Sequence, residues 1–238
     1  MKPSITSIPP LADPVLKRPH AILFDWDNTL VNTWPTIHRA LTQTFETMGH
    51  TPWSMEETQE KVHRSMRDAF PAIFGNNWQQ AAELYQKNFR SIHLDMLEPL
   101  PLAQELLDSL KGSGIYTAVV SNKTNVNLHK ELAHIGWEPY FDKVVGALDA
   151  VSDKPSAAPV LLALEKSGIA PNNHVWFIGD SITDMECAHN SGCLPILFGT
   201  RDLNTPEFKA FPPAHTFTDH AHLRDVLHTL IHNAPSHK

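Results

Sequence analysis

A ten-residue stretch, AILFDWDNTL at positions 21–30, places the strongest constraint on how this chain can fold. It begins as an apolar run and ends in two aspartates one residue apart, Asp25 and Asp27. A short apolar run bounded by Pro19 and by polar residues predicts a buried strand of a parallel sheet. Asp25 then lies at the carboxyl end of that strand, where open α/β sheets bind their ligands. A carboxylate buried there requires a cation or hydrogen-bond donors to stabilise it.

The remainder of the chain alternates between helical and strand patterns. Further strands are expected at about residues 115–120, 143–147, 174–178 and 194–198, with amphipathic helices between them. Strands separated by helices predict right-handed crossovers, and therefore an α/β fold with a Rossmann-like, doubly wound parallel sheet. The Pro-rich residues 1–19 predict an extended N-terminal arm.

Three consecutive helical patterns interrupt the chain after the first strand, at about residues 33–48, 55–69 and 78–97. The second begins with a capping box, Ser54 with Glu57. We expect an inserted all-helical cap subdomain at residues 33–97, and a Rossmann-like core made of residues 20–32 and 98–238. Glu98-Pro99 is the expected return hinge.

Composition limits the classes of partner. The chain of 238 residues has a net charge of -7 and no long basic run, which disfavours nucleic acid and anionic membranes as partners. No apolar run approaches the roughly 20 residues that cross a bilayer. We expect a cytoplasmic protein, monomeric or homodimeric, with a small-molecule partner.

Polar residues follow three of the predicted strands, namely Asp25, Ser121 and Asp180, and Asp184 comes one helical turn after Asp180. In a doubly wound sheet these strand ends meet at one edge. Carboxylates clustered there repel one another unless a hard cation binds between them, and an all-oxygen site with few protein ligands suits Mg²⁺. Lys154, just before a predicted helix, can bring a positive charge to the same edge for an anion.

Four motifs in this order, DWDNTL, VVSN, the lysine of DKPSAAP and GDSITD, resemble those of the haloacid dehalogenase superfamily, in its branch of phosphatases similar to phosphoglycolate phosphatase. With the helical insert, the resemblance covers about residues 21–200. Each motif alone is weak, and the ordered set is specific. Asn28 departs from the pattern, because glycine often follows the second aspartate.

The resemblance implies a role for each residue. Asp25 is the expected nucleophile, which forms an aspartyl-phosphate, and Asp27 is the expected general acid and base. The expected Mg²⁺ ligands are Asp25, the backbone carbonyl of Asp27, and Asp180, with Asp184 binding directly or through water. Phosphate contacts are expected from Ser121, the backbone amide of Asn122 and Lys154, with Thr29 supporting the loop. The expected substrate is a small phosphorylated metabolite, and phosphoglycolate is one candidate.

Several alternatives stay open at this point. A sugar-phosphate mutase uses the same aspartyl-phosphate, and a phosphonate hydrolase would need a cap lysine such as Lys61 or Lys87. Dehalogenases of the superfamily lack the second acid, so Asp27 favours phosphoryl transfer. In the cap, Arg64 and Arg67 either contact substrate or lie on a solvated face.

Single motifs suggest more distant alternative functions. Gly179-Asp180-Ser181 with Asp219 and His222 is similar to the blocks of some serine esterases, but this block comes late in the chain. A calcium loop starting at Asp25 fails because position six is Leu30 and position twelve is Thr36. A fold retained only for binding is the non-enzymatic alternative.

Overall fold

The core of the protein is a six-stranded parallel sheet in the order β5-β4-β1-β6-β7-β8. This computed structural model describes residues 16–62 and 66–232, without the side chains of residues 66–69. β1 is central, so the strands on both sides of it end next to Asp25. In chain order the strands are β1 (Ala21–Phe24), β4 (Tyr116–Thr124), β5 (Lys143–Ala147), β6 (Val175–Gly179), β7 (Leu194–Phe198) and β8 (His215–Phe217).

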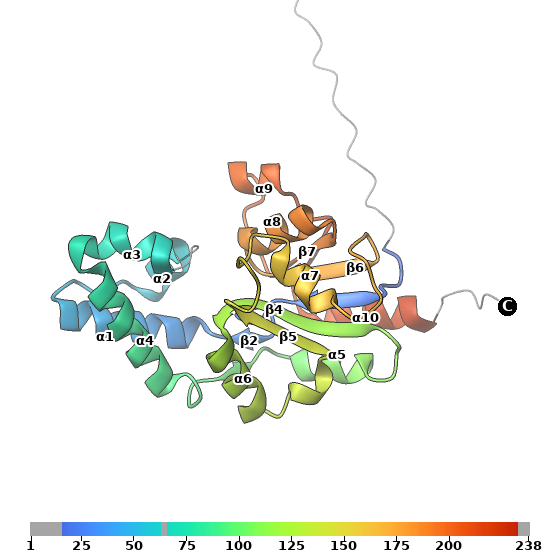
Figure 1. The fold of residues 1–238 in the computed structure, drawn as a ribbon, viewed down its shortest axis with the longest axis horizontal. Coiled ribbons are helices and arrows are strands. Elements are labelled where there is room, and N and C mark those ends of the chain that lie inside the picture. Colours follow the sequence, from blue (N-terminus) through green and yellow to red (C-terminus); the bar gives the residue numbers. More distant parts are fainter. Residues whose placement is uncertain (1–15, 63–65, 233–238) are drawn as a thin grey trace, which may run out of the picture.

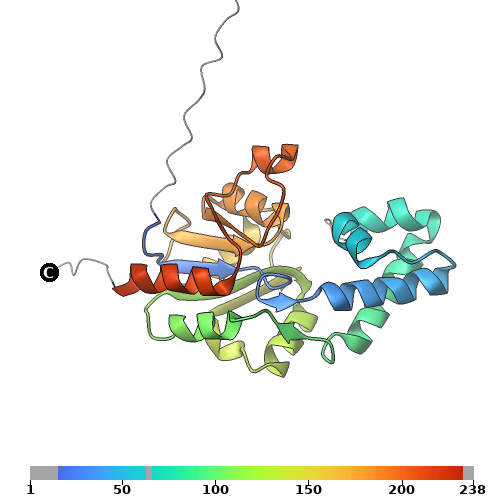
Figure 2. The same ribbon diagram turned by 180° about the vertical axis from the view of Figure 1, so that it is seen from behind.

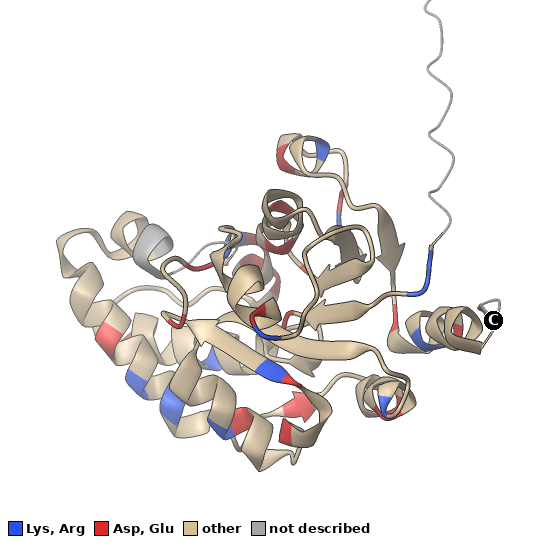
Figure 3. Cartoon of the chain, turned by 45° about the vertical axis from the view of Figure 1, so that its right-hand side comes forward, with Lys and Arg blue, Asp and Glu red and all other residues tan. Residues whose placement is uncertain are grey.

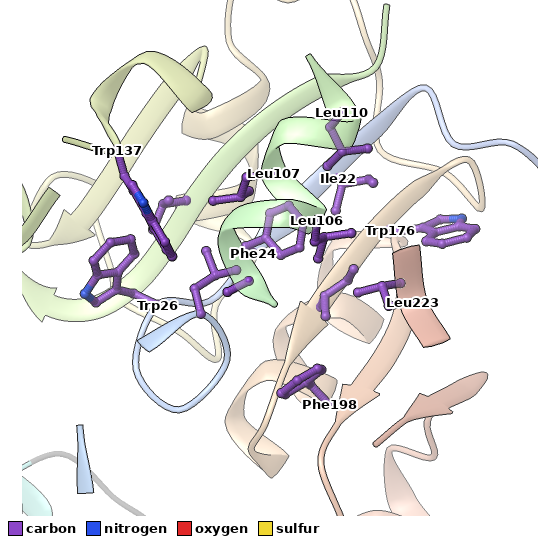
Figure 4. Close-up of a cluster of buried hydrophobic side chains, with 14 of the residues drawn as sticks. Ile22, Phe24, Trp26, Leu106, Leu107, Leu110, Trp137, Trp176, Phe198 and Leu223 are labelled. Atoms are coloured by element: carbon purple, nitrogen blue, oxygen red, sulfur yellow. The ribbon is translucent and has the colours of Figure 1, made fainter. Parts of the chain in front are cut away.

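Helices cover both faces of the sheet, as the alternating pattern predicts (Figure 1). Side chains of a strand alternate between faces. Ile22 and Phe24 pack with α5 (Ala103–Leu110), α6 (Asn125–His134) and α10 (His220–His232), as Figure 4 shows in part. Ala21 and Leu23 pack with α7 (Ala158–Leu164) and α8 (Ile182–Ser191) on the opposite face. β1 is therefore completely buried, which fits its unbroken apolar run.

A separate helical unit projects from the core, as both ribbon views show (Figures 1 and 2). It has its own apolar cluster, built around Leu41, Phe45, Phe70 and Phe74. A two-stranded antiparallel ribbon joins the unit to the core, so the chain leaves and returns at one place. The elements are β2 (Val31–Asn32), α1 (Trp34–Met48), α2 (Met55–Lys61), α3 (Met66–Phe74), η1 (Gly75–Asn77), α4 (Trp78–Ile92) and β3 (Glu98–Pro99).

Three expectations within the helical unit were wrong. The helix predicted over residues 55–69 starts at the Ser54 capping box but ends at Lys61, because Val62 leaves the helical conformation (φ -91°, ψ 78°). Pro71 falls between two of the predicted helices but lies inside α3, where burial of Phe70 and Phe74 in the cluster outweighs the lost backbone hydrogen bond. The last helix ends at Ile92 rather than at residue 97.

Some core elements also differ from prediction. β4 continues to Thr124, beyond the predicted strand at about residues 115–120, so α6 starts only at Asn125. The sheet also has a strand after residue 198, β8, which was not predicted because its three residues are too few to show a periodic pattern. The helix α9 (Pro206–Ala210) and the turn η2 (Glu138–Tyr140) are similarly short. None of the helices within residues 16–62 and 66–232 is long and apolar enough to span a membrane.

Candidate active site

The carboxyl ends of the three central strands bring the predicted polar residues together. β4, β1 and β6 are neighbours in the sheet; Asp25 and Asp180 directly follow β1 and β6, whereas Ser121 lies inside β4, which continues to Thr124. All three residues are buried. Acidic residues gather at this edge of the core, on the side facing the helical unit (Figure 3). The structure therefore places Asp25 and Asp180 side by side at this edge, with Ser121 in the adjacent strand.

A buried carboxylate triad forms at this edge. Asp25, Asp180 and Asp184 each offer one oxygen, and these oxygens lie within 4.8 Å of one another. Asp184 is in the first turn of α8, where its Oδ2 accepts hydrogen bonds from the Ser181 amide (3.0 Å) and hydroxyl (2.6 Å). Gly179 makes this approach possible, because a Cβ there would lie 2.3 Å from Asp184 Cγ. The residue at position 179 is thus constrained by the triad.

Lys154 binds two members of the triad. Its Nζ lies 2.6 Å from Asp25 Oδ1 and 2.7 Å from Asp184 Oδ1, with the lysine side chain only 4% exposed. The Asn122 side chain holds the Lys154 backbone: its amide nitrogen donates to the Lys154 carbonyl, and its oxygen accepts from the Lys154 amide. Asn122 therefore positions Lys154, a side-chain role that the sequence did not indicate.

The charges at the triad are incompletely compensated. Burial raises the pKa of Asp25 well above its ordinary value, with Lys154 opposing the rise and Asp184 adding to it. Burial, together with the charge of Asp184, also raises the pKa of Asp180, to about 7, although Arg201 binds this carboxylate. For Lys154, burial lowers the pKa, but Asp184 and Asp25 outweigh it and raise it above the usual value. A further cation would relieve the repulsion among the carboxylates.

Arg201 is a residue of this site that the sequence analysis missed. Its Nε donates to the Asp180 carbonyl at 2.9 Å, and its guanidinium pairs with the Asp180 carboxylate. Arg201 follows β7, which pairs with β6. It therefore lies after the next strand along the same edge of the sheet. A search for polar residues after β7, as was done for the other strands, would have predicted it.

Asp27 sits beside Asp25 on a tight loop but has different partners. Its Oδ1 accepts hydrogen bonds from Thr33 Oγ1 (2.5 Å) and pairs with Lys123 Nζ (2.6 Å). Asn28 adopts a left-handed backbone conformation (φ 57°), which asparagine tolerates better than most residues other than glycine. The replacement of glycine by Asn28 noted in the sequence is therefore compatible with the loop.

The other predicted residues have varied surroundings. Ser121 Oγ accepts a hydrogen bond from the Lys123 amide. Thr29 is buried, its hydroxyl lacks a hydrogen-bond partner among the described residues, and its carbonyl lies 2.8 Å from His220 Nε2. Arg64 lies outside the described residues, and only the backbone of Arg67, within α3, is described.

The sequence of the chain matches a known family over most of its length. Residues 22–197 match the haloacid dehalogenase-like hydrolases, a range that contains the whole carboxylate site. The chain belongs to this family. It is a hydrolase with a parallel α/β core, and its fold is similar to that of a solved hydrolase of the same superfamily.

Three relatives illustrate the match. The hydrolase is 30% identical over 194 residues to a phosphoglycolate phosphatase of Neisseria meningitidis, covering 77% of this chain and 82% of the relative. It is 24% identical to the pyrophosphatase PpaX of Halalkalibacterium halodurans, over 87% and 96% of the two chains. A crystal structure of a hydrolase of the same superfamily from Ehrlichia chaffeensis is 32% identical, with a TM-score of 0.64 over 91% of this chain and 99% of that one.

Proposed function

We propose that this hydrolase is a Mg²⁺-dependent phosphatase that cleaves a small phosphomonoester through an aspartyl-phosphate on Asp25. The observation that carries the proposal is the position of Asp25, which is buried at the end of the central strand and contacts Lys154 next to two more carboxylates. Such a site combines a nucleophile, an anion-binding cation and oxygen ligands for a metal.

The residues present fit a magnesium ion. Asp25, Asp180 and Asp184 supply oxygen ligands, and Mg²⁺ prefers one or two carboxylates with water completing its octahedron. The raised pKa values of Asp25 and Asp180 indicate that these carboxylates lack sufficient positive charge without a metal. We assign the Asp27 carbonyl as a further ligand from the resemblance to the family. When bound, the ion supplies electrostatic stabilisation of the phosphoryl oxygens.

The chain's own residues then perform two displacements. In the first, an oxygen of Asp25 bonds to phosphorus, the bond from phosphorus to the leaving oxygen breaks, and Asp27 gives that oxygen its proton. In the second, Asp27 takes a proton from a water that attacks the aspartyl-phosphate, and the Asp25–phosphorus bond breaks. The phosphoryl oxygens, which carry negative charge during transfer, accept hydrogen bonds from Lys154, Ser121 and the backbone amide of Asn122.

The helical unit, residues 33–97, serves in this proposal as a cap over the carboxylate edge. Closure of such a unit excludes water and brings residues to the part of the substrate beyond the phosphate. Arg64 and Arg67 are the proposed contacts to that part. The choice of substrate therefore depends on α2 and α3 and on the segment between them.

The relatives and the cap side chains narrow the substrate class. Relatives of this hydrolase include phosphatases for phosphoglycolate and for pyrophosphate, so both compounds are candidate substrates. Lys61 pairs with Glu57 on the surface and Lys87 is exposed, which disfavours a buried Schiff-base lysine of a phosphonate hydrolase. Ser181 donates to Asp184 rather than to a histidine, which disfavours a serine esterase.

A Mg²⁺-dependent screen against phosphorylated metabolites, with phosphoglycolate and pyrophosphate included, tests the proposal. We expect turnover of at least one compound, loss of turnover in EDTA, and no turnover by Asp25→Asn. Asp202→Asn, at an exposed position near the site, is the matched control and should keep full activity. Turnover that survives EDTA or Asp25→Asn would refute the mechanism.

A further inference from the structure

A second buried charge network lies beside the carboxylate triad and is built around Glu131 of α6. The Glu131 side chain is 1% exposed and accepts three contacts. Lys123 Nζ lies 2.5 Å from its Oε2, Trp26 Nε1 donates to the same oxygen at 2.7 Å, and His93 Nδ1 lies 2.7 Å from Oε1. These donors come from three segments that are far apart in the sequence, so one carboxylate ties together the nucleophile loop, the end of β4 and the end of α4.

Lys123 connects this network to Asp27. Its Nζ contacts Asp27 Oδ1 at 2.6 Å and Glu131 at 2.5 Å, and its side chain is only 5% exposed. Burial lowers the pKa of Lys123, but the neighbouring charges of Asp27 and Glu131 outweigh it and raise the pKa, so the lysine keeps its charge. The Thr33 hydroxyl also donates to Asp27 Oδ1. Lys123 and Thr33 therefore orient the Asp27 carboxyl through the same oxygen, and Oδ2 is directed away from both residues.

Trp26 fixes the backbone between the two aspartates in the same way. Its indole nitrogen binds Glu131, and its ring packs edge-on against Trp137 with ring centroids 5.9 Å apart. Because Trp26 stands between Asp25 and Asp27, its anchoring limits the rotation of the loop that carries both carboxylates. Glu131 therefore acts on Asp27 along two routes, through Lys123 and through the Trp26 backbone.

The last turn of α4 completes the network from the helical unit. Phe89 stacks on the His93 ring with centroids 5.4 Å apart, and Lys123 Nζ lies 5.3 Å from the centre of the Phe89 ring. His93 is the C-cap residue of α4 and is 3% exposed. The end of the proposed cap is thus part of the structure that surrounds Asp27.

We propose that Lys123 and Glu131 are positioning residues for Asp27, and that His93 makes this positioning depend on the last turn of α4. This inference rests on the proposed function, because it assigns a purpose to the orientation of the general acid and base. Stability alone is a weak reason for such a network, since well-packed apolar side chains replace buried ion pairs at little or no cost. Orientation of a carboxyl toward a leaving oxygen requires the directional contacts that this network provides.

Leaving-group dependence separates positioning from general damage. An alkyl phosphate needs its leaving oxygen protonated by Asp27, whereas p-nitrophenyl phosphate has a good leaving group that needs little protonation. The test compares kcat/KM for p-nitrophenyl phosphate and for an alkyl phosphate hydrolysed in the screen. The main variant is the double change Lys123→Met with Glu131→Gln, which removes both charges together and leaves an amide to pair with Trp26 and His93.

For this double variant we expect about a 10- to 100-fold loss on the alkyl phosphate and less than about a threefold loss on p-nitrophenyl phosphate. Asp27→Asn should show the same selectivity more strongly. Lys130→Met, at an exposed neighbour of Glu131, is the matched control and should change neither. Lys123→Arg, which keeps a positive charge, should restore part of the alkyl activity relative to Lys123→Met.

The outcomes distinguish the two proposals. If the wild type hydrolyses neither ester, the proposed function is wrong. If the wild type is active and the folded double variant loses equal activity on both esters, the positioning role is wrong. If the double variant does not fold, Trp26→Phe, which removes one donor and keeps an aromatic ring, gives the same decision. His93→Leu should lower alkyl phosphate hydrolysis selectively, and unchanged selectivity would overturn the part assigned to α4.

Discussion

Replacing Asp180 with asparagine tests the electrostatics of the site directly. Burial and the charge of Asp184 raise the pKa of Asp180 from 3.8 to about 7, against the opposing charge of Arg201. Between pH 4 and 7 the folded protein therefore retains a proton that the unfolded chain has released. Because the folded state binds more protons, the free energy of unfolding of the metal-free protein falls as pH rises through this range. Asparagine resembles the protonated acid and removes this loss.

The pKa shift sets the size of the effect. Each pKa unit corresponds to about 1.4 kcal/mol, so a rise from 3.8 to about 7 corresponds to at most about 4 kcal/mol. The pair with Arg201 already contributes to that pKa and needs no separate correction. In EDTA at pH 8 we expect Asp180→Asn to be more stable than the wild type by about 2–4 kcal/mol, allowing for relaxation around the charge. At pH 4 the two proteins should be nearly equal.

Urea unfolding at a series of pH values in EDTA, followed by circular dichroism, measures this difference. Mg²⁺ should then stabilise the wild type at pH 8 and stabilise Asp180→Asn much less, because binding to the folded state adds stability by mass action. Asp202→Asn, which changes an exposed carboxylate nearby, controls for net charge and should show no comparable gain. A variant less stable than the wild type at pH 8, or a difference independent of pH, would refute the reasoning.

Three further changes probe the same edge of the sheet. Asp25→Asn should lower kcat by at least roughly 10³-fold while circular dichroism shows an intact fold, because the proposed nucleophile is lost and asparagine has nearly the same shape. Lys154→Met removes the cation that contacts both Asp25 and Asp184, and should lower the unfolding free energy in EDTA at pH 8 by about 3–5 kcal/mol, with partial recovery in Mg²⁺. Gly179→Ala places a Cβ 2.3 Å from Asp184 Cγ, so it should weaken Mg²⁺ binding by about tenfold or more in calorimetry and destabilise the fold by about 1–3 kcal/mol. An unchanged affinity in Gly179→Ala would mean that Asp184 is not a ligand.

The local sequence pattern was sufficient to predict the site residues that directly follow a strand. The apolar run before Asp25 predicted a buried central strand, and the same rule placed Asp180 directly after the neighbouring strand β6. The rule works because parallel strands joined by right-handed crossovers have all their carboxyl ends at one edge. The prediction ended the next strand too early, at about residue 120, because β4 continues past Ser121 to Thr124.

Predictions for the helical unit were less accurate because packing decides its boundaries. Pro71 disfavours a helix interior locally, but Phe70 and Phe74 bury their rings in the cluster only if α3 continues through it. The Ser54 capping box, in contrast, depends on residues three apart and was predicted correctly. A helix start that depends on residues within one turn can be predicted from the sequence. A helix boundary that depends on whether buried side chains compensate for an unfavourable local residue cannot.

By itself, the sequence determined which polar groups the candidate site contains: carboxylates that follow strands, a lysine before a helix, and a second acid two residues after Asp25. Only the tertiary structure decided how those groups are paired. Trp26 and Glu131 are 105 residues apart and Lys154 and Asp25 are 129 apart, yet each pair is in direct hydrogen-bond contact. The physical reason is that a hydrogen bond or ion pair forms over about 3 Å, and no local periodicity encodes which distant side chain arrives at that distance.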